Sequence, residues 1–132
     1  MEIEQSHLDE FIHLLAQHAP NEGLNKTHLP DVALSRMTRP AERQPLMYEP
    51  MLVMMGQGAK VCYIGNRVLD YRAGEYLILF LPMPLEVTIY DVSPERPGLM
   101  SGFRLDLSRL AQVVLRLDDV DNAATRLPSN AD

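Results

Sequence analysis

The fold is decided by residues 51–90, which read MLVMMGQGAKVCYIGNRVLDYRAGEYLILFLPMPLEVTIY. Short runs rich in Val, Ile, Tyr and Leu alternate here with glycine-containing turns, a pattern typical of β-strands joined by tight connections. The stretch predicts strands at 51–55, 60–64, 67–71, 76–81 and 85–90. The pair Gly65-Asn66 predicts a hairpin, because both residues tolerate the positive φ that a two-residue turn needs.

Three glycines of this stretch, Gly58, Gly65 and Gly74, are expected where strands reverse. Glycine accepts left-handed backbone angles because it has no Cβ to clash with the backbone. A glycine loop that binds phosphate should open a helix, and no helical pattern follows any of the three. The sequence therefore predicts turn geometry at these positions and no nucleotide site.

Before this stretch, residues 6–19 show the apolar spacing of an amphipathic helix, with Ser6 as the expected N-cap and Pro20 at its end. Five prolines between 20 and 50 discourage any helix there, so extended chain and loops are expected, with one strand at 32–36.

After the stretch, residues 99–105 predict one more strand, and Ser108 is the expected N-cap of a helix over about 108–117. Its apolar side chains are expected to pack on the strands, with pairing to a second subunit as the alternative. The polar, acidic residues 118–132 predict a flexible tail or linker.

Helices at the two ends and strands between them predict one mainly β domain over residues 1–117. We expect a small antiparallel sandwich or barrel over about 30–105, since parallel sheets need crossover helices that this chain lacks. A chain of 132 residues is long enough to bury such a core.

The charge balance argues against direct DNA binding. The chain has 12 Lys and Arg against 18 Asp and Glu, a net charge of -6, and no basic cluster. Lys26 and Lys60 are its only lysines, and each cation is expected to be a solvated surface group or the partner of a carboxylate. The single Cys62 excludes an internal disulfide, and no secretion signal or membrane-length apolar segment occurs, so we expect a cytoplasmic protein without membrane contact.

Enzyme chemistry has no support in the residue pattern. All four histidines, His7, His13, His18 and His28, precede the main strands, whereas a metal site in a β-barrel needs ligands that converge from strands. Cys62 has no activating base near it in sequence, and the carboxylates form no acid/base pair. We therefore expect no catalytic residue, no metal and no cofactor.

Several motifs together resemble the N-terminal domain of AraC-type transcription regulators, over most of residues 24–117. They are Tyr48-Glu49-Pro50, Gly56-Gln57-Gly58-Ala59-Lys60, Gly65, Tyr71-Arg72-Ala73-Gly74-Glu75-Tyr76-Leu77 and Leu81-Pro82-Met83-Pro84. The resemblance implies a cupin-like barrel that senses a small-molecule effector or supports a homodimer, followed by helix-turn-helix units that bind DNA. Residues after 117 lack the length and basic charge of such units, so DNA would be bound only through a missing C-terminal domain.

A ligand cavity in such a domain would be mostly apolar with a few polar groups. The candidate effector-binding residues are Arg36, Tyr63, Tyr71, Tyr76 and Arg104, with Met51, Met54 and Cys62 as lining. Alternation along a strand does not reveal which face points inward, so each tyrosine is alternatively a core residue. Two other functions stay open: a stand-alone cupin-like binding protein or enzyme, and an interaction domain with a filled core.

Overall fold

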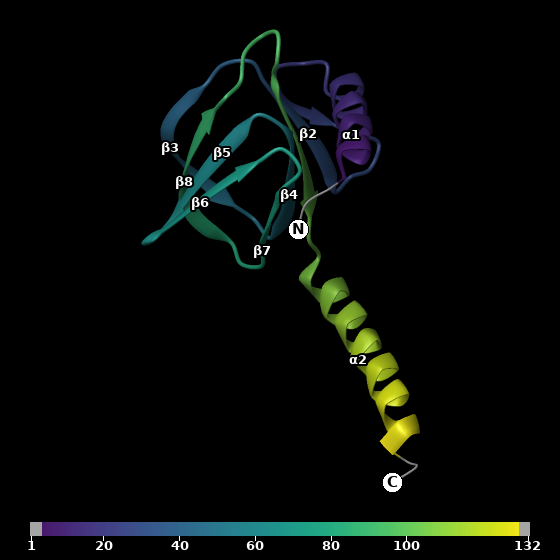
Figure 1. Cartoon of the computed structure of the whole chain (residues 1–132). Helices are drawn as coiled ribbons and strands as arrows, with labels where there is room; N and C mark the ends of the chain where they lie inside the picture. Colours follow the sequence, from purple (N-terminus) through teal and green to yellow (C-terminus); the bar gives the residue numbers. More distant parts are fainter. Residues whose placement is uncertain (1–3, 130–132) are drawn as a thin grey trace.

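The computed structural model describes residues 4–129, and the side chains of residues 4–119. Within these residues, nine strands form two antiparallel sheets, with one helix before them and one after (Figure 1). The first sheet has the order β1-β2-β9-β4-β7 and the second the order β3-β8-β5-β6. The elements are α1 (Gln5–His18), β1 (Gly23–Lys26), β2 (Val32–Met37), β3 (Ala41–Tyr48), β4 (Met51–Gln57), β5 (Ala59–Ile64), β6 (Arg67–Arg72), β7 (Tyr76–Leu79), β8 (Met83–Tyr90), β9 (Gly98–Arg104) and α2 (Leu107–Ser129).

The mainly β, antiparallel architecture with a helix at each end is confirmed, and the two sheets form an open sandwich rather than a closed barrel. The Gly65-Asn66 hairpin is also confirmed, because Ile64 of β5 pairs with Arg67 of β6 and Gly65 has a φ of 57°. At Gly58, however, the chain does not reverse within one sheet. The strands on either side of it, β4 and β5, belong to different sheets, so Gly58 is a corner between them.

Two strands of the structure were not predicted, and both lie at the edge of a sheet. β3 covers part of the segment expected to be unpaired extended chain, and Pro45 lies opposite Glu86 of β8 in its register. Proline has no N–H to donate, so it is tolerated on an edge strand, where one side of the backbone needs no partner. β1 has only four residues, too few for an alternation pattern to stand out.

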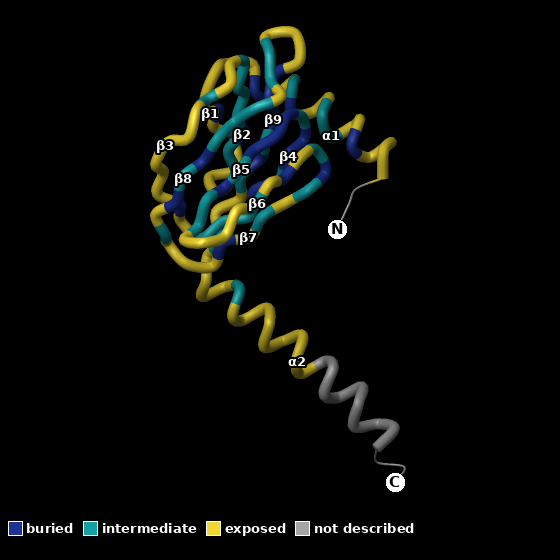
Figure 2. Tube along the Cα trace, turned by 60° about the vertical axis from the view of Figure 1, so that its left-hand side comes forward, coloured by how far each residue is buried: buried dark blue, intermediate teal, exposed yellow. Residues whose placement is uncertain are grey.

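Two groups of buried apolar side chains stabilise the sandwich (Figure 2). One group fills the space between the sheets, and the other lies between the first sheet and α1. Helix α1 approaches the sheet closely at Gly56, where a Cβ would lie 2.5 Å from Leu15 Cδ1. The inner group is Tyr48, Val53, Met55, Cys62, Tyr71, Leu79, Leu85 and Val87, and the group under α1 is Leu15, Ala19, Leu34 and Leu99.

The predicted caps of both helices were wrong by two residues. Helix α1 begins at Gln5, with Glu4 as N-cap, so Ser6 lies inside the helix. Helix α2 begins at Leu107, and the carboxylate of Asp106 accepts a hydrogen bond from the backbone N–H of Arg109 at 3.1 Å. A carboxylate in this position satisfies a free N–H of the first turn, the role predicted for Ser108.

Helix α2 continues to Ser129, so the predicted end at 117 was wrong. No Gly or Pro occurs between Leu107 and Leu127, and acidic composition alone does not end a helix. The helix extends away from the sandwich, and every side chain from 107 to 119 is exposed except the half-buried Leu110 (Figures 1 and 2). The expected packing of this helix on the strands is therefore absent from the described residues. No described helix is long and apolar enough to cross a membrane.

Candidate functional site

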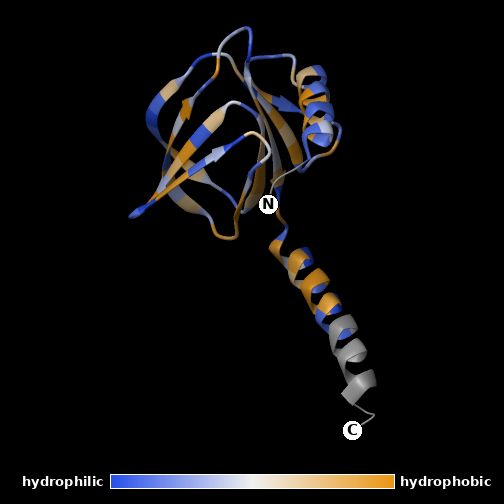
Figure 3. Cartoon of the chain, viewed as in Figure 1, coloured by the Kyte–Doolittle hydropathy of each residue, from blue (hydrophilic) through white to orange (hydrophobic). Residues whose placement is uncertain are grey.

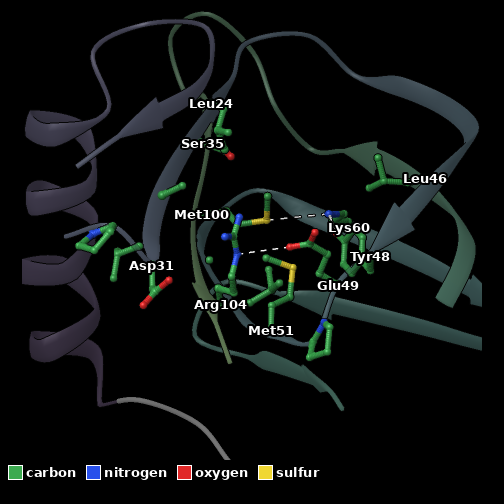
Figure 4. A pocket seen from close by; sticks show the side chains of 16 residues that line it. Leu24, Asp31, Ser35, Leu46, Tyr48, Glu49, Met51, Lys60, Met100 and Arg104 are labelled. Atoms are coloured by element: carbon green, nitrogen blue, oxygen red, sulfur yellow. Dashed lines mark hydrogen bonds and ion pairs between the residues drawn. The ribbon is translucent and has the colours of Figure 1, made fainter. Parts of the chain in front are cut away.

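A cavity of about 400 Å³ lies between the two sheets (Figure 4). Strands β1, β2, β4 and β9 of the first sheet and β3 and β5 of the second contribute to its wall. Its volume is in the range of small-molecule sites, and most of its wall is apolar. The lining residues are Leu24, Pro30, Asp31, Val32, Ala33, Ser35, Leu46, Tyr48, Glu49, Pro50, Met51, Val53, Lys60, Met100, Gly102 and Arg104.

Strand alternation determines which side chains reach this cavity. In β2, Ala33 and Ser35 line the cavity, whereas Leu34 packs in the cluster under α1. Arg36 has the same parity as Leu34 and also faces α1. Its Nε donates to the carbonyl oxygen of Ala19 at 2.6 Å and its Nη2 to that of Ala16 at 3.1 Å. The structure therefore places Arg36 at the C-terminal end of α1, outside the cavity.

Lys60 of β5 is the buried charged group of the cavity, with 2% of its surface exposed. Its ammonium group donates a hydrogen bond to the hydroxyl oxygen of Tyr48, and its Nζ lies 4.0 Å from Met100 Sδ (Figure 4). Among the side chains of residues 4–119, no carboxylate lies within 4.0 Å of Nζ. An ammonium group in a largely apolar wall thus has a phenol and a thioether as neighbours, and no counter-ion within the part of the chain whose side chains are described.

Burial changes the proton affinity of this group and of its neighbours. The loss of hydration lowers the pKa of Lys60 to about 8, so the side chain is mostly charged at neutral pH. Burial raises the pKa of Tyr48, Tyr71 and Cys62 above their ordinary values, so these three groups are neutral at that pH. Lys60 is therefore the one charged member of this buried group.

Exposed charges surround the mouth of the cavity. Arg104 Nε lies 3.3 Å from Glu49 Oε2, and both side chains are 64% exposed. Asp31, also exposed, lines the same rim. Ion pairs this exposed contribute little to stability, so the rim can change its contacts when a ligand enters.

Two of the residues proposed from sequence lie at the cavity, namely Arg104 at its mouth and Met51 in its wall. Tyr71 and Cys62 lie in the core beside it, where Cys62 Sγ is 3.8 Å from the Tyr71 hydroxyl oxygen. Both point into the sandwich but lie outside the cavity wall.

The other proposed side chains lie on outer faces of the sheets. The guanidinium group of Arg43 stacks 3.9 Å from the ring centroid of Tyr63 on the second sheet. Met54 has the parity of Gly56, which faces α1, and pairs in register with the 38% exposed Tyr76. Neither Tyr63, Tyr76 nor Met54 contributes to the cavity wall.

Sequence reasoning missed Lys60 and Tyr48 as site residues. Lys60 was expected to be a solvated surface group or the partner of a carboxylate. It lies two residues before the buried Cys62 in an apolar strand, so both side chains point to the same face of the sheet, and this shared face was the available signal. Tyr48 was noted only as part of a motif, at the end of a strand that was not predicted.

The histidines lie away from the cavity, three of them on α1 and His28 between β1 and β2. Within the described part of the chain, no group of three or more His, Cys, Asp or Glu residues is arranged to hold a metal ion.

Comparison with known proteins gives one match. A family model described as the AraC-type transcriptional regulator N-terminus matches residues 28–131. No curated protein and no solved structure matches the chain significantly.

Proposed function

The chain belongs to the N-terminal domain family of AraC-type transcriptional regulators, and we propose that its cavity binds the small-molecule effector of such a regulator. The observation that carries this proposal is the cavity itself, about 400 Å³ of mostly apolar space with one buried ammonium group. A sandwich that served only as a scaffold would gain stability by filling this space, because unfilled apolar volume is destabilising.

The backbone offers a route from the cavity to α2. The backbone N–H of Arg104 donates to the carbonyl oxygen of Asp31 at 2.8 Å, and that of Leu105 donates to Pro50 at 3.0 Å. Asp31 and Pro50 both line the cavity, and the chain enters α2 at Leu107. A ligand that moves either rim segment would change how α2 leaves the sandwich, and so bias the presentation of an attached DNA-binding part.

The second part of the proposal is that α2 pairs with α2 of another copy to form a homodimer. Leu107, Leu110, Val114 and Leu117 follow the alternating three-and-four spacing of a two-helix seam. All but Leu110 are exposed, and the hydropathy colours of Figure 3 mark much of the first part of this helix as hydrophobic. DNA would then be bound by a separate domain of a cytoplasmic regulator, and the cavity needs no catalytic residue.

Thermal unfolding with a library of small metabolites tests the effector proposal, because a ligand that binds only the folded state raises the melting temperature. We expect hits with the natural chain and with Ala33→Ser, and none with Ala33→Phe, because Ala33 lines the cavity and a phenyl ring would occupy it. An absence of hits, or hits that Ala33→Phe retains, would contradict the proposal.

A further inference from the structure

We propose that the cavity selects apolar molecules that carry one carboxylate, with the ammonium group of Lys60 as the counter-ion and the Tyr48 hydroxyl as a second donor. This inference rests on the proposed function, since it names the ligand class of the same cavity.

The Lys60 ammonium group is buried without a counter-ion among the described residues. A charged group removed from water loses its hydration, and the loss is compensated only by a partner of opposite charge or by strong hydrogen bonds. Lys60 is 2% exposed, and its neighbours in the described residues are the Tyr48 hydroxyl and Met100 Sδ. A carboxylate is the group that this position lacks.

The second argument is the arrangement of donors. The Tyr48 oxygen accepts from Lys60, so its own hydroxyl proton can be donated to a ligand oxygen in place of the neighbouring Tyr71 hydroxyl. Tyr48 is on β3 and Lys60 on β5, with β8 between the two strands, but the ammonium group contacts the hydroxyl and both line the cavity, so both can donate to one carboxylate. Two donors to one carboxylate make charge-assisted hydrogen bonds, which are stronger than neutral ones.

The third argument concerns the rest of the ligand. Beyond Lys60, the wall consists mainly of Met51, Val53, Met100 and other apolar groups, which favour an alkyl or aryl tail. A second carboxylate would lie on this apolar wall or near Asp31 and Glu49 at the rim, where the one cation among the described residues, Arg104, is already paired with Glu49. Dicarboxylates of the same length are therefore disfavoured.

Isothermal titration of the full chain tests the inference with matched probes: octanoate against octanamide, and 4-phenylbutyrate against its amide. Suberate serves as the dicarboxylate of octanoate length.

We expect each monocarboxylate to bind at least about tenfold more tightly than its amide, the difference expected of a charge-assisted contact. We expect suberate to bind more weakly than octanoate. Lys60→Met should abolish the preference for carboxylate over amide. The only other lysine, the exposed Lys26, provides the matched control, and Lys26→Met should retain the preference.

The pH dependence of binding by the natural chain tests the same inference if Lys60→Met fails to fold. In the natural chain, the affinity for octanoate should fall as the pH rises above 8, because Lys60 then loses its proton, whereas the affinity for octanamide should stay constant. The neighbours Tyr48, Cys62 and Tyr71 have raised pKa values, so their neutral forms predominate from pH 7 to pH 9. The charged groups at the rim of the cavity are Asp31, Glu49 and Arg104.

Three outcomes overturn the inference. If the amides bind as tightly as the carboxylates, or if Lys60→Met keeps the preference, Lys60 is not the counter-ion, although the cavity still binds ligands. If only neutral metabolites bind, and Ala33→Phe abolishes their binding, effector sensing stands and the carboxylate class is wrong. If no compound of any class binds, the proposed function fails together with the inference.

Discussion

Lys60 combines a strand position that faces inward with a side chain that prefers water. Its pKa of about 8 is far below the ordinary value of 10.5, so the folded state holds the proton less tightly than the unfolded chain does. Between these two pH values the unfolded chain binds more protons, and stability therefore rises with pH. Below pH 8 the buried charge lowers the free energy of unfolding by its full amount, and above pH 8 this destabilisation decreases as Lys60 loses its proton.

We predict that the free energy of unfolding of the natural chain increases relative to that of Lys60→Met by ~2 kcal/mol from pH 7 to pH 9.5. Denaturant titrations of both proteins at each pH measure this difference, and the subtraction removes the contributions of Cys62 and the tyrosines. Lys60→Met is expected to be the more stable protein at pH 7, because it removes an unpaired buried charge. A difference that does not change with pH would contradict the burial of a charged Lys60.

Arg36 was a candidate ligand contact and is instead a structural residue. We predict that Arg36→Met lowers the free energy of unfolding by about 1–3 kcal/mol, because two charge-assisted hydrogen bonds to α1 are lost. Octanoate binding should not change. The exposed Arg67 supplies the control, and Arg67→Met should affect neither property. Weaker binding at unchanged stability would place Arg36 in the ligand site after all.

The residues of the site were the least predictable part of the chain. Alternation in β2 separates Ala33 and Ser35 from Leu34 and Arg36, but it does not reveal which pair faces the second sheet. That choice depends on α1, which covers one face of the first sheet through contacts distant in sequence. Lys60 was missed because charged side chains are seldom buried without a partner.

Among the elements, the corner between β4 and β5 depends on one glycine. Gly58 has a φ of 88°, and a Cβ there would lie 2.7 Å from Val92 Cγ1 and 3.1 Å from the backbone Cα of Gly98. Gly65 has a φ of 57° and no atom within 4 Å of an added Cβ. Alanine at Gly65 would therefore add backbone strain alone, whereas alanine at Gly58 would add both backbone strain and steric crowding.

We predict that Gly58→Ala destabilises the fold by about 3 kcal/mol and Gly65→Ala by about 1 kcal/mol, as measured by urea unfolding. The larger loss reflects the contact with Gly98, whose backbone cannot move without disturbing β9. Equal losses for the two variants would mean that the corner adapts and that only φ matters.

Most elements followed from local pattern, because strands with glycine turns and an amphipathic helix carry their signal within about ten residues. β3 was missed because Pro45, with Pro40 just before the strand, hides an edge strand. The end of α2 was misjudged because acidic composition was read as a stop without a helix breaker. The pairing of β2 with β9 joins residues 61 to 71 positions apart, from Met37–Gly98 to Val32–Phe103, and nothing local to either strand indicates it.

The whole molecule consists of a sandwich with a cavity and a helix that leaves it unpartnered within the described residues. We predict that the chain is a dimer of 14.9 kDa subunits in solution, and that Val114→Glu makes it monomeric by placing a charge in the apolar seam. Gln112→Glu, on the opposite side of α2, should remain dimeric. Light scattering at several concentrations measures both. If the natural chain is monomeric at every concentration, the proposed pairing of α2 with a second copy is wrong.

The methyl groups of the methionines test the cavity as the ligand site most directly. Met51 and Met100 line it, whereas Met54 lies on the outer face of the first sheet and Met47 is 66% exposed on β3. In a ¹³C-methyl NMR titration with octanoate, the account predicts saturable shifts of the Met51 and Met100 resonances and none for Met47 and Met54. Shifts confined to Met47 or Met54, or octanoate binding without any shift of Met51 and Met100, would contradict it.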